Sequence, residues 1–356
     1  MTGILDQARA LRDEDAFDVV RVDAYLKRHI EDLHGTPTVT QFPGGASNLT
    51  YLLTYPNREL VLRRPPLGAK AKSAHDMLRE AQVMASLKPH YPYVPTILAA
   101  CEDATVIGQH FYVMERLRGI ILRRDLPVEL GLDSDGVRAL CHSFVDRLVE
   151  LHRVDTSNPD VQHIGKGEGY IARQVSGWSD RWRQAATDDT DPCNDVVAWL
   201  NEKQPAHDNA TCVIHNDYRF DNVVLDPERP LHIIGVLDWE MATLGDPLMD
   251  LGGSLAYWVQ ADDDATFQSF RRQPSNAPGM LTRREVIDYY GHRTGRAVDN
   301  FDFYEVFGVF RLMVIIQQIY RRFALGQTTQ PQFAGFGQAA RYMGERCRRI
   351  IARSVL

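Results

Sequence analysis

The 356-residue sequence, with 44% hydrophobic and 24% charged side chains, is long enough to bury a sizeable core and to form about two domains. A formal net charge of -7, with lysine and arginine scattered along the chain, argues against a nucleic-acid partner, which normally requires clustered basic residues. The five cysteines are far apart and form no CxxC pair, which favours reduced thiols in the cytoplasm over disulfides or a zinc site.

The first stretch, residues 1–34, is predicted to be a helical N-terminal extension. Val19, Val22, Leu26 and Ile30 fall on one side of a helix and charged residues on the other, so this helix is expected to pack on a larger body. Acidic residues precede any apolar stretch of a signal peptide, and no run approaches the length that spans a bilayer. We therefore expect neither secretion nor a membrane partner.

Residues 35–117 are predicted to form a small mixed domain. Three β-like runs, VTQFPGG, LTYLLTY and LVLRR, follow one another as an antiparallel meander. A helix is expected from about residue 74 to residue 87, where Lys88-Pro89 blocks its continuation. Two further β-like runs, TILAACED and HFYVMERL, complete the domain.

Residues 118–356 are predicted to be mostly helical. Helical patterns occupy about 136–153, 170–185, 192–203, 283–292 and 301–325, and a last helix begins near 333. The exception is a pair of β-like runs, NVVL and HIIGVLDW, joined by a turn at Asp226-Pro227. Because a hairpin folds its ends together, Asp238 is expected to lie beside Asn222.

The polar segment HNDYRFDN, residues 215–222, lies directly before this hairpin. An amide and a carboxylate at the open end of a hairpin suit Mg²⁺, a hard ion that completes its shell with phosphate and water, so Asn222 and Asp238 are the predicted ligands. On a strand, Glu240 would point to the same side as Asp238 and add a third ligand. Asp217, on a loop, is predicted to face an incoming hydroxyl.

The order of these residues resembles the kinase signature H-x-D-x-x-x-x-N followed by a hairpin and an acidic metal ligand. His215, Asp217, Asn222 and Asp238 occupy the matching places, with His215 expected to brace the loop. The second motif is DWE rather than DFG, and Asn216 replaces the usual arginine. These departures make the chain similar to aminoglycoside phosphotransferase-like and choline-kinase-like small-molecule kinases.

A later segment, LGDPLMDLG at 244–252, resembles the G-D-P-x-x-D-L segment of the same small-molecule kinases. Asp246 and Asp250 are expected to be structural, capping a helix that begins near Pro247 and holding the catalytic loop. The resemblance implies an α+β, two-lobed protein-kinase-like fold, with a small antiparallel-sheet N-lobe, a mostly helical C-lobe, and ATP or GTP as co-substrate. Only five residues separate Glu240 from Asp246, too few for a peptide-binding activation segment.

The same resemblance implies a nucleotide site in the N-lobe. Small residues are predicted at a turn between two strands, where backbone amides can approach phosphates. These residues are Gly44, Gly45, Ser47 and Asn48. Any β-hairpin can carry such a turn, so the turn alone does not identify a phosphate site. Arg63 matches the phosphate-binding lysine of the third strand, and Arg64, on the opposite strand face, is the competing choice.

Further N-lobe residues follow from the match. Glu80 corresponds to the glutamate that pairs with the strand cation, and the backbone groups of Glu115 and Leu117 are expected to meet the adenine edge. Arg311, Gln318 and Arg322 share one helix face in the C-lobe, which favours a neutral or anionic acceptor; the alternative is that these arginines only cover apolar surface with their side-chain stems.

The overall pattern looks most like the kinase-like domains that are fused to acyl-CoA dehydrogenases. It implies Mg²⁺-dependent transfer of the γ-phosphoryl group of ATP or GTP to a hydroxyl of a small molecule, with a hydroxy acid or hydroxyacyl thioester as a candidate. The alternatives are an aminoglycoside O-phosphotransferase, a catalytically silent nucleotide-binding regulator, and a Mg²⁺-dependent phosphohydrolase.

Overall fold

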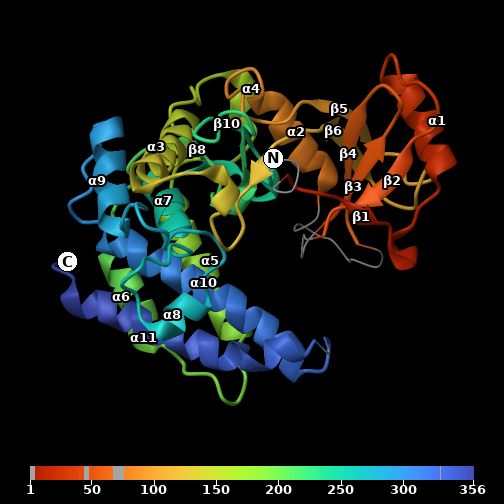
Figure 1. The fold of residues 1–356 in the computed structure, drawn as a ribbon. Helices are drawn as coiled ribbons and strands as arrows, with labels where there is room; N and C mark the ends of the chain where they lie inside the picture. Colours follow the sequence, from red (N-terminus) through yellow and green to blue (C-terminus); the bar gives the residue numbers. More distant parts are fainter. Residues whose placement is uncertain (1–4, 44–47, 67–75, 329) are drawn as a thin grey trace. The chain divides into compact units, whose positions relative to one another are not determined.

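The computed structural model describes residues 5–43, 48–66, 76–328 and 330–356 (Figure 1). The chain forms two compact units. The first contains Met1–Leu132, Asn158–Val161 and Phe220–Ala242, and the second contains Asp133–Ser157, Gln162–Arg219 and Thr243–Leu356. These divisions differ from the predicted domain boundaries, because the hairpin after residue 220 packs with the N-terminal part of the chain.

The first unit is built on a six-stranded antiparallel sheet in the order β1-β2-β3-β4-β6-β5. The predicted meander is confirmed as β2, β3 and β4, and the second pair of runs forms β5 and β6. Their bounds are Arg9–Ala10 for β1, Thr38–Gln41 for β2, Leu49–Thr54 for β3, Glu59–Arg64 for β4, Ile97–Cys101 for β5 and Phe111–Glu115 for β6.

Helix α1, Val19–His29, covers one face of this sheet. Its buried Val22 and Leu26 belong to one hydrophobic cluster with alternate strand residues such as Tyr51 and Leu62, because successive side chains of a strand point to opposite faces. The predicted N-terminal helix is therefore present, but it begins only at Val19, after Asp18 caps it. Helix α2, Met77–Leu87, lies against β5 and β6.

The hairpin predicted from NVVL and HIIGVLDW is also present in the first unit. Strands β9, Val223–Leu225, and β10, Ile233–Val236, pair antiparallel, and β9 also pairs with β7, Ile120–Ile121. Gly119 allows this contact, since a Cβ atom there would lie 2.4 Å from the carbonyl oxygen of Leu225. Strand β7, which follows the large sheet in the sequence, is thus paired with the hairpin.

The second unit is mostly helical, and the predicted helices are present within a few residues of their expected bounds. They are α3 Ser134–Leu151, α5 Tyr170–Gln184, α6 Asn194–Lys203, α7 Pro247–Leu255, α9 Arg283–Thr294, α10 Asp302–Ala324 and α11 Phe336–Arg353. The short helix α8, Ala265–Ser269, is not among the predicted helices. Strands β8, Cys212–Ile214, and β11, Thr243–Gly245, pair antiparallel beside them. The short helix α4 is Pro159–Gln162, and 3-10 turns occupy Asp13–Asp15, Val128–Leu130, Phe220–Asn222, Trp239–Met241 and Pro331–Gly335.

Helix α10 is central to the second unit and packs against α7 and α11. Two glycines bring α7 and α10 together: a Cβ atom on Gly308 would lie 2.2 Å from the carbonyl oxygen of Gly252. By length and composition alone α10 could cross a membrane, which differs from the sequence-based expectation that no run is long enough. Its most apolar window is 56% buried within the unit, as in a core helix.

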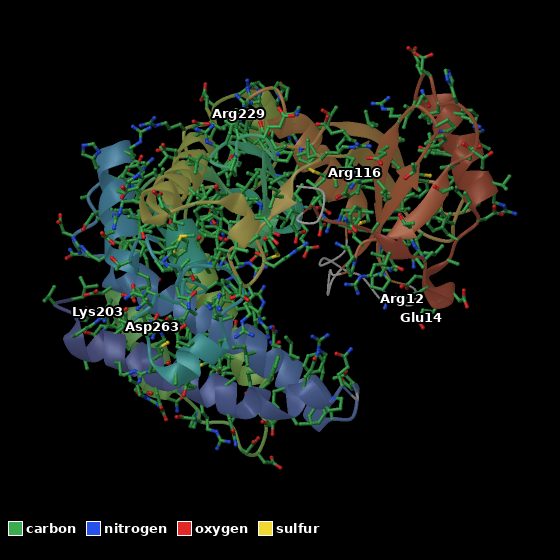
Figure 2. All side chains as sticks on the ribbon, viewed as in Figure 1. Arg12, Glu14, Arg116, Lys203, Arg229 and Asp263 are labelled. Atoms are coloured by element: carbon green, nitrogen blue, oxygen red, sulfur yellow. The ribbon has the colours of Figure 1, made fainter. Side chains whose placement is uncertain are left out.

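Several exposed charges pair with residues a few positions away. Arg12 lies near Glu14, with side chains 59% and 76% exposed, and Arg229 pairs with Asp226 on the hairpin turn (Figure 2). Exposed pairs of this kind add little to stability. The fold is therefore held mainly by its apolar cores and by the buried ionic contacts described below.

Candidate active site

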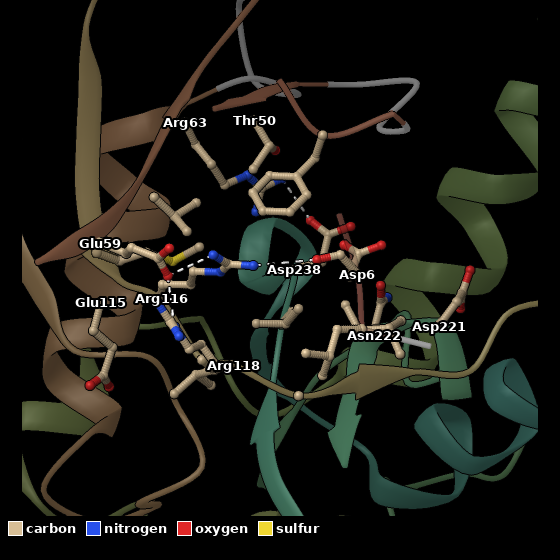
Figure 3. A pocket seen from close by; sticks show the side chains of 18 of the residues that line it. Asp6, Thr50, Glu59, Arg63, Glu115, Arg116, Arg118, Asp221, Asn222 and Asp238 are labelled. Atoms are coloured by element: carbon tan, nitrogen blue, oxygen red, sulfur yellow. Dashed lines mark hydrogen bonds and ion pairs between the residues drawn. The ribbon is translucent and has the colours of Figure 1, made fainter. Parts of the chain in front are cut away.

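A cavity of about 290 Å³ opens in the first unit. Residues from β3, β4 and β6, from the linker after β6 and from the end of the hairpin line it. Both predicted metal ligands, Asn222 and Asp238, lie on its wall (Figure 3). The cavity therefore brings residues together that are more than 100 positions apart in the sequence.

The hairpin places Asn222 and Asp238 at its open end. Val223 pairs with Val236, and the backbone amide of Leu237 donates to the carbonyl oxygen of Asn222 at 2.8 Å. Asp238 then takes a left-handed conformation with φ of 68°, which is uncommon for a residue other than glycine. One carboxylate and one amide thus face the same cavity, a donor set that suits a hard cation.

Glu240 differs from the prediction. Strand β10 ends at Val236, and the left-handed Asp238 leads into the 3-10 turn Trp239–Met241, so the strand alternation expected to align Glu240 with Asp238 is absent. The Glu240 carboxylate instead accepts a hydrogen bond of 2.7 Å from the side-chain amide of Asn48. The expectation that both acids lie on one strand face is wrong, and Glu240 is not among the residues that line the cavity.

Asn48 is itself buried at the start of β3, where its amide reaches Glu240 rather than the cavity wall. The other residues predicted for the phosphate loop, Gly44, Gly45 and Ser47, lie outside the described residues. Arg79 of α2 donates to the carbonyl oxygens of Glu240 and Ala242 at 3.0 and 2.6 Å. The turn after Asp238 is thereby fixed to α2 and to the start of β3.

An ionic chain runs from α2 to the predicted metal site. Arg63 donates to Glu80 at 2.6 Å and to Asp238 at 3.1 Å. Burial raises the pKa of Glu80, and the Arg63 charge offsets part of that rise. Burial alone would lower the pKa of Arg63, but Glu80 raises it well above its usual value. Arg63 therefore carries a permanent positive charge to the wall of the cavity.

Arg64 faces the other side of the sheet. Its guanidinium donates to the Tyr51 hydroxyl at 3.0 Å and to the Asp15 carbonyl oxygen at 2.7 Å, and it is almost completely buried. Strand alternation separates the two arginines. Arg63 lines the cavity and Arg64 holds the N-terminal segment.

The predicted hinge residues Glu115 and Leu117 also line the cavity. The Glu115 side chain accepts from the Thr96 amide at 2.7 Å and from Lys88 at 3.3 Å. The Glu115 backbone amide also donates to the Thr96 carbonyl oxygen at 2.9 Å, so both the side chain and the amide are held by neighbouring protein groups.

Sequence reasoning missed an ionic group at this edge of the cavity. Arg116 and Arg118 donate to the same oxygen of Glu59 at 2.6 and 2.7 Å (Figure 3). Burial would raise the pKa of Glu59, but the hydrogen bonds from Arg118 and Arg116 lower it. Only the pairing of β4 with β6 brings these side chains together, so no local sequence signal identifies the group.

The segment before Asn222, which carries the predicted base Asp217, belongs to the second unit and is held by buried hydrogen bonds. Asp250 accepts from the amides of His215 and Asn216 at 2.8 and 2.7 Å, and His152 lies 3.1 Å from the same carboxylate. Burial would raise the pKa of Asp250, but the hydrogen bond with His152 and the electrostatic interactions with His152 and His215 lower it. Asp250 thus orders two successive peptide groups next to Asp217.

His215 and Asp246 have structural contacts of the kind expected. His215 is fully buried, and its ring nitrogen Nδ1 lies 3.2 Å from the Asp217 amide. Asp246 caps α7 by accepting from the amides of Leu248 and Met249. These contacts fix the loop, while Asp217 keeps a partly exposed carboxylate.

No group of three or more His, Cys, Asp or Glu residues arranged around a common point occurs in the part of the chain that the structure describes. Asn222 and Asp238 supply one amide and one carboxylate. This small donor set fits Mg²⁺, which usually keeps water and substrate phosphate in its shell, better than Zn²⁺.

Comparison with known proteins agrees with this geometry. A family model described as "Phosphotransferase enzyme family" matches residues 38–286. Acyl-CoA dehydrogenase family member 10 of Mus musculus is 34% identical over 90% of this chain and 30% of its own length. Acyl-CoA dehydrogenase family member 11 of Homo sapiens is 33% identical over 92% of this chain and 42% of its own length. The chain thus spans less than half of these relatives.

Solved structures share the fold. A protein of Ralstonia eutropha JMP134, provisionally described as an aminoglycoside phosphotransferase, has a TM-score of 0.81 and 29% identity, with 96% of this chain and 100% of that chain covered. Choline kinase from Cryptosporidium parvum has a TM-score of 0.65 and 12% identity, covering 94% and 96%. Spectinomycin phosphotransferase, solved with ADP and spectinomycin, has a TM-score of 0.59 and 13% identity, covering 94% and 98%. The α+β protein-kinase-like fold is thereby confirmed.

Proposed function

Because this chain belongs to the phosphotransferase enzyme family, we propose that it transfers the γ-phosphoryl group of ATP or GTP to a hydroxyl of a small hydroxy acid or hydroxyacyl thioester. One observation carries the proposal: the hairpin places Asn222 and Asp238 in the same cavity as Arg63, whose charge is fixed by Glu80. This arrangement suits a metal-bound polyphosphate.

The nucleotide would lie in the cavity of the first unit. The backbone at Glu115 and Leu117 would meet the base, and Arg63 would contact phosphate oxygens with its planar fork. Asn222 and Asp238 would hold Mg²⁺, which when bound neutralises phosphate charge. The spectinomycin phosphotransferase was solved with ADP, which supports a nucleotide as co-substrate for this fold.

Asp217 would act on the acceptor. Its carboxylate would orient the hydroxyl and take its proton as the acceptor oxygen bonds to the γ-phosphorus and the bond to the β-phosphate bridging oxygen breaks. The chain passes from Asp217 to Asn222 in five residues, so one segment carries both the base and a metal ligand. Positioning and charge stabilisation supply most of the rate in such transfers.

The acceptor class is supported by charge and by the relatives. Arg181 and Arg311 both lie over the Trp178 ring, 4.6 and 5.4 Å from its centre, in the second unit. A cationic surface favours an anionic acceptor over a polycationic aminoglycoside. The names of the mouse and human relatives place those proteins among acyl-CoA dehydrogenases, which supports an acyl compound.

A screen of hydroxy acids, hydroxyacyl thioesters and aminoglycosides for ADP or GDP release tests the proposal. We expect acceptor-dependent turnover with an anionic hydroxy compound, and loss of about two or more orders of magnitude in kcat for Asp217→Asn with nucleotide binding retained. Turnover with aminoglycosides alone would favour the second candidate, suggested by the Ralstonia structure. Phosphate release without an acceptor would indicate a phosphohydrolase, and nucleotide binding without turnover a regulator.

A further inference from the structure

The carboxylate of Asp217 contacts the guanidinium of Arg219, two residues further along the chain. The Nε atom of Arg219 lies 3.0 Å from one carboxylate oxygen of Asp217, and a terminal guanidinium nitrogen donates to the other at 3.1 Å. The two side chains are 19% and 22% exposed. The terminal nitrogen makes a hydrogen bond, and the Nε contact is an ion pair without hydrogen-bond geometry, so the guanidinium lies against both oxygens of the carboxylate.

The residue between them explains why both side chains emerge together. Tyr218 is fully buried, its hydroxyl donates to the Phe144 carbonyl oxygen at 2.8 Å, and its own carbonyl oxygen accepts from Ser254 at 2.7 Å. Asp217 and Arg219 therefore flank a buried anchor. Their contact is built into the loop by the fold.

The guanidinium of Arg219 also lies over an aromatic ring, which serves as its platform. Its guanidinium carbon lies 4.7 Å from the centre of the Tyr257 ring, a distance at which a cation over an aromatic face is attracted. The same guanidinium thus contacts both the Tyr257 ring and the Asp217 carboxylate. Arg219 is thereby restrained by two side chains from different parts of the second unit.

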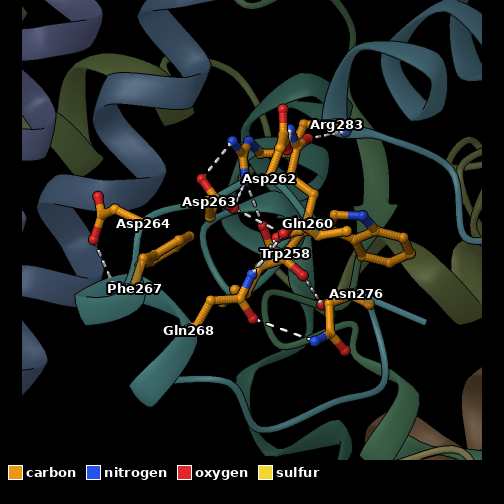
Figure 4. Close-up of polar contacts among 12 residues, drawn as sticks. Trp258, Gln260, Asp262, Asp263, Asp264, Phe267, Gln268, Asn276 and Arg283 are labelled. Atoms are coloured by element: carbon orange, nitrogen blue, oxygen red, sulfur yellow. Dashed lines mark hydrogen bonds and ion pairs between the residues drawn. The ribbon is translucent and has the colours of Figure 1, made fainter. Parts of the chain in front are cut away.

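The Tyr257 platform is rigid because the segment after α7 is extensively hydrogen-bonded. The Tyr257 carbonyl oxygen accepts from Gln273 at 3.2 Å. The next residue, Trp258, is fully buried; its indole donates to Leu281 at 2.9 Å, and its carbonyl oxygen accepts from Arg283 at 2.8 Å (Figure 4). Asp263 in turn holds Arg283 at 2.6 Å.

We propose that Arg219, stacked on Tyr257, is a positioning residue that presents the carboxylate of Asp217 to the acceptor hydroxyl during phosphoryl transfer. This inference rests on the proposed function. A carboxylate offers about four acceptor sites on its two oxygens; Arg219 takes one of them with a hydrogen bond and meets the other oxygen at ion-pair distance. The hydroxyl then meets a preset oxygen instead of a rotating group, which lowers the entropic part of the barrier.

The reaction itself is unchanged by this role. The acceptor proton passes to Asp217, the new bond forms between the acceptor oxygen and the γ-phosphorus, and the nucleoside diphosphate leaves. Arg219 neither gains nor loses a proton, since its guanidinium stays charged. Because its contribution is geometric, loss of Arg219 should lower kcat and leave the affinity for nucleotide nearly unchanged.

Steady-state kinetics of the full chain tests the role with Arg219→Gln and Arg219→Lys. For Arg219→Gln we expect kcat to fall by about 10- to 100-fold, the scale of misplaced catalytic groups, while the KM for nucleotide changes less than about twofold. Arg219→Lys keeps the charge but loses the fork, so it should recover only part of the rate. Added guanidinium ion should restore turnover of Arg219→Ala more than an equal concentration of sodium chloride.

A matched control is available on the hairpin turn. Arg229 contacts Asp226 through the same two kinds of nitrogen, at 3.1 and 2.9 Å, but lies away from the cavity. Arg229→Gln should leave kcat and KM unchanged. A kcat of Arg219→Gln equal to that of the wild type, or a loss that neither lysine nor guanidinium reverses, would overturn the positioning role.

A measurement without turnover separates this inference from the proposed function. Nitrogen-detected NMR of the arginine side chains should show hindered rotation of the Arg219 guanidinium in the wild type and free rotation in Tyr257→Leu and Asp217→Asn. Free rotation in the wild type overturns the clamp whether or not an acceptor is found. If the Arg219 guanidinium is restrained but no acceptor supports turnover, the proposed function is wrong, and the positioning role in catalysis is wrong with it.

Discussion

At the scale of single residues, the cavity wall depends on side chains whose charges are fixed by burial. Arg63 bridges a fully buried glutamate and a half-exposed aspartate, so it links the interior of the first unit to the predicted metal site. Removing one partner of such a chain leaves an uncompensated charge, which costs more than the contact itself contributes. Two predictions follow from this asymmetry.

Glu80→Gln removes the buried countercharge of Arg63. We expect the free energy of unfolding to fall by about 3 kcal/mol, the lower range for breaking a buried ion pair. Asp288→Asn, which removes the exposed partner of Arg284 in α9, should change it by less than about 1 kcal/mol. Urea unfolding of both variants measures the difference; equal small effects would contradict the structural role of the buried pair.

Asp238→Ala removes the carboxylate proposed to hold Mg²⁺. We expect Mg²⁺-dependent nucleotide binding to be lost, because polyphosphate charge would remain uncompensated in the cavity. Calorimetric titration with ADP, with and without Mg²⁺, measures this. Asp226→Ala, on the exposed turn of the same hairpin, should bind as the wild type does. Unaltered binding by Asp238→Ala would refute the metal assignment.

At the scale of elements, close helix contacts and caps position the catalytic loop. Helix α7 carries Asp246 and Asp250 and packs on α10 through glycines, so the loop is set by where α7 lies. A shift of α7 would move the acceptor of the His215 and Asn216 amides. The packing of α7 on α10 and the hydrogen bonds of Asp250 can be tested separately.

Gly308→Ala tests the packing of α10 on α7. The added methyl group would lie 2.2 Å from the Gly252 carbonyl oxygen, so the helices must separate, at a cost of about 1–3 kcal/mol. Gly335→Ala has no atom within 4 Å of the new methyl group and should be nearly neutral. Thermal unfolding compares the two. A neutral Gly308→Ala would mean that the helices move apart without cost.

Asp250→Asn tests the loop anchor and its pH dependence. The amide keeps the size but loses acceptor capacity for three partners, so we expect a loss of about 1–3 kcal/mol. The folded pKa is lowered, so the stabilisation is complete above about pH 4, the unfolded value, and disappears as pH falls through the folded pKa. The free energies of unfolding of the wild type and of Asp250→Asn should differ at neutral pH and converge at acidic pH, as unfolding curves at both pH values will measure. A difference that stays constant with pH would contradict the linkage.

At the scale of the whole molecule, the described lining of the cavity proposed for the nucleotide lies within the first unit, while Asp217 lies in the second. Nucleotide should therefore stabilise the unfolding transition of the first unit. At about one hundred times Kd the gain is about 2.7 kcal/mol. Calorimetry with Mg²⁺-ADP should move this transition in the wild type and not in Asp238→Ala. Equal shifts of both variants would argue against the cavity as the nucleotide site.

Much of this molecule follows from local sequence. The helical periodicity, the meander of β2 to β4 and the hairpin turn predicted the elements within a few residues, because apolar spacing and turn residues act over short distances. The same short-range reasoning predicts that Asn222 lies beside Asp238 at the open end of the hairpin. The short distance between Glu240 and Asp246 also followed directly from residue count.

Other features required the tertiary structure, because they depend on strand register and packing between distant segments. The left-handed turn at Asp238 redirected Glu240 to Asn48, which alternation along a strand could not predict. The group of Glu59, Arg116 and Arg118 exists only because β4 pairs with β6. The sequence alone determined which residue types are available for phosphoryl transfer; packing decided which of them meet, since contact energy depends on distance in space and not along the chain.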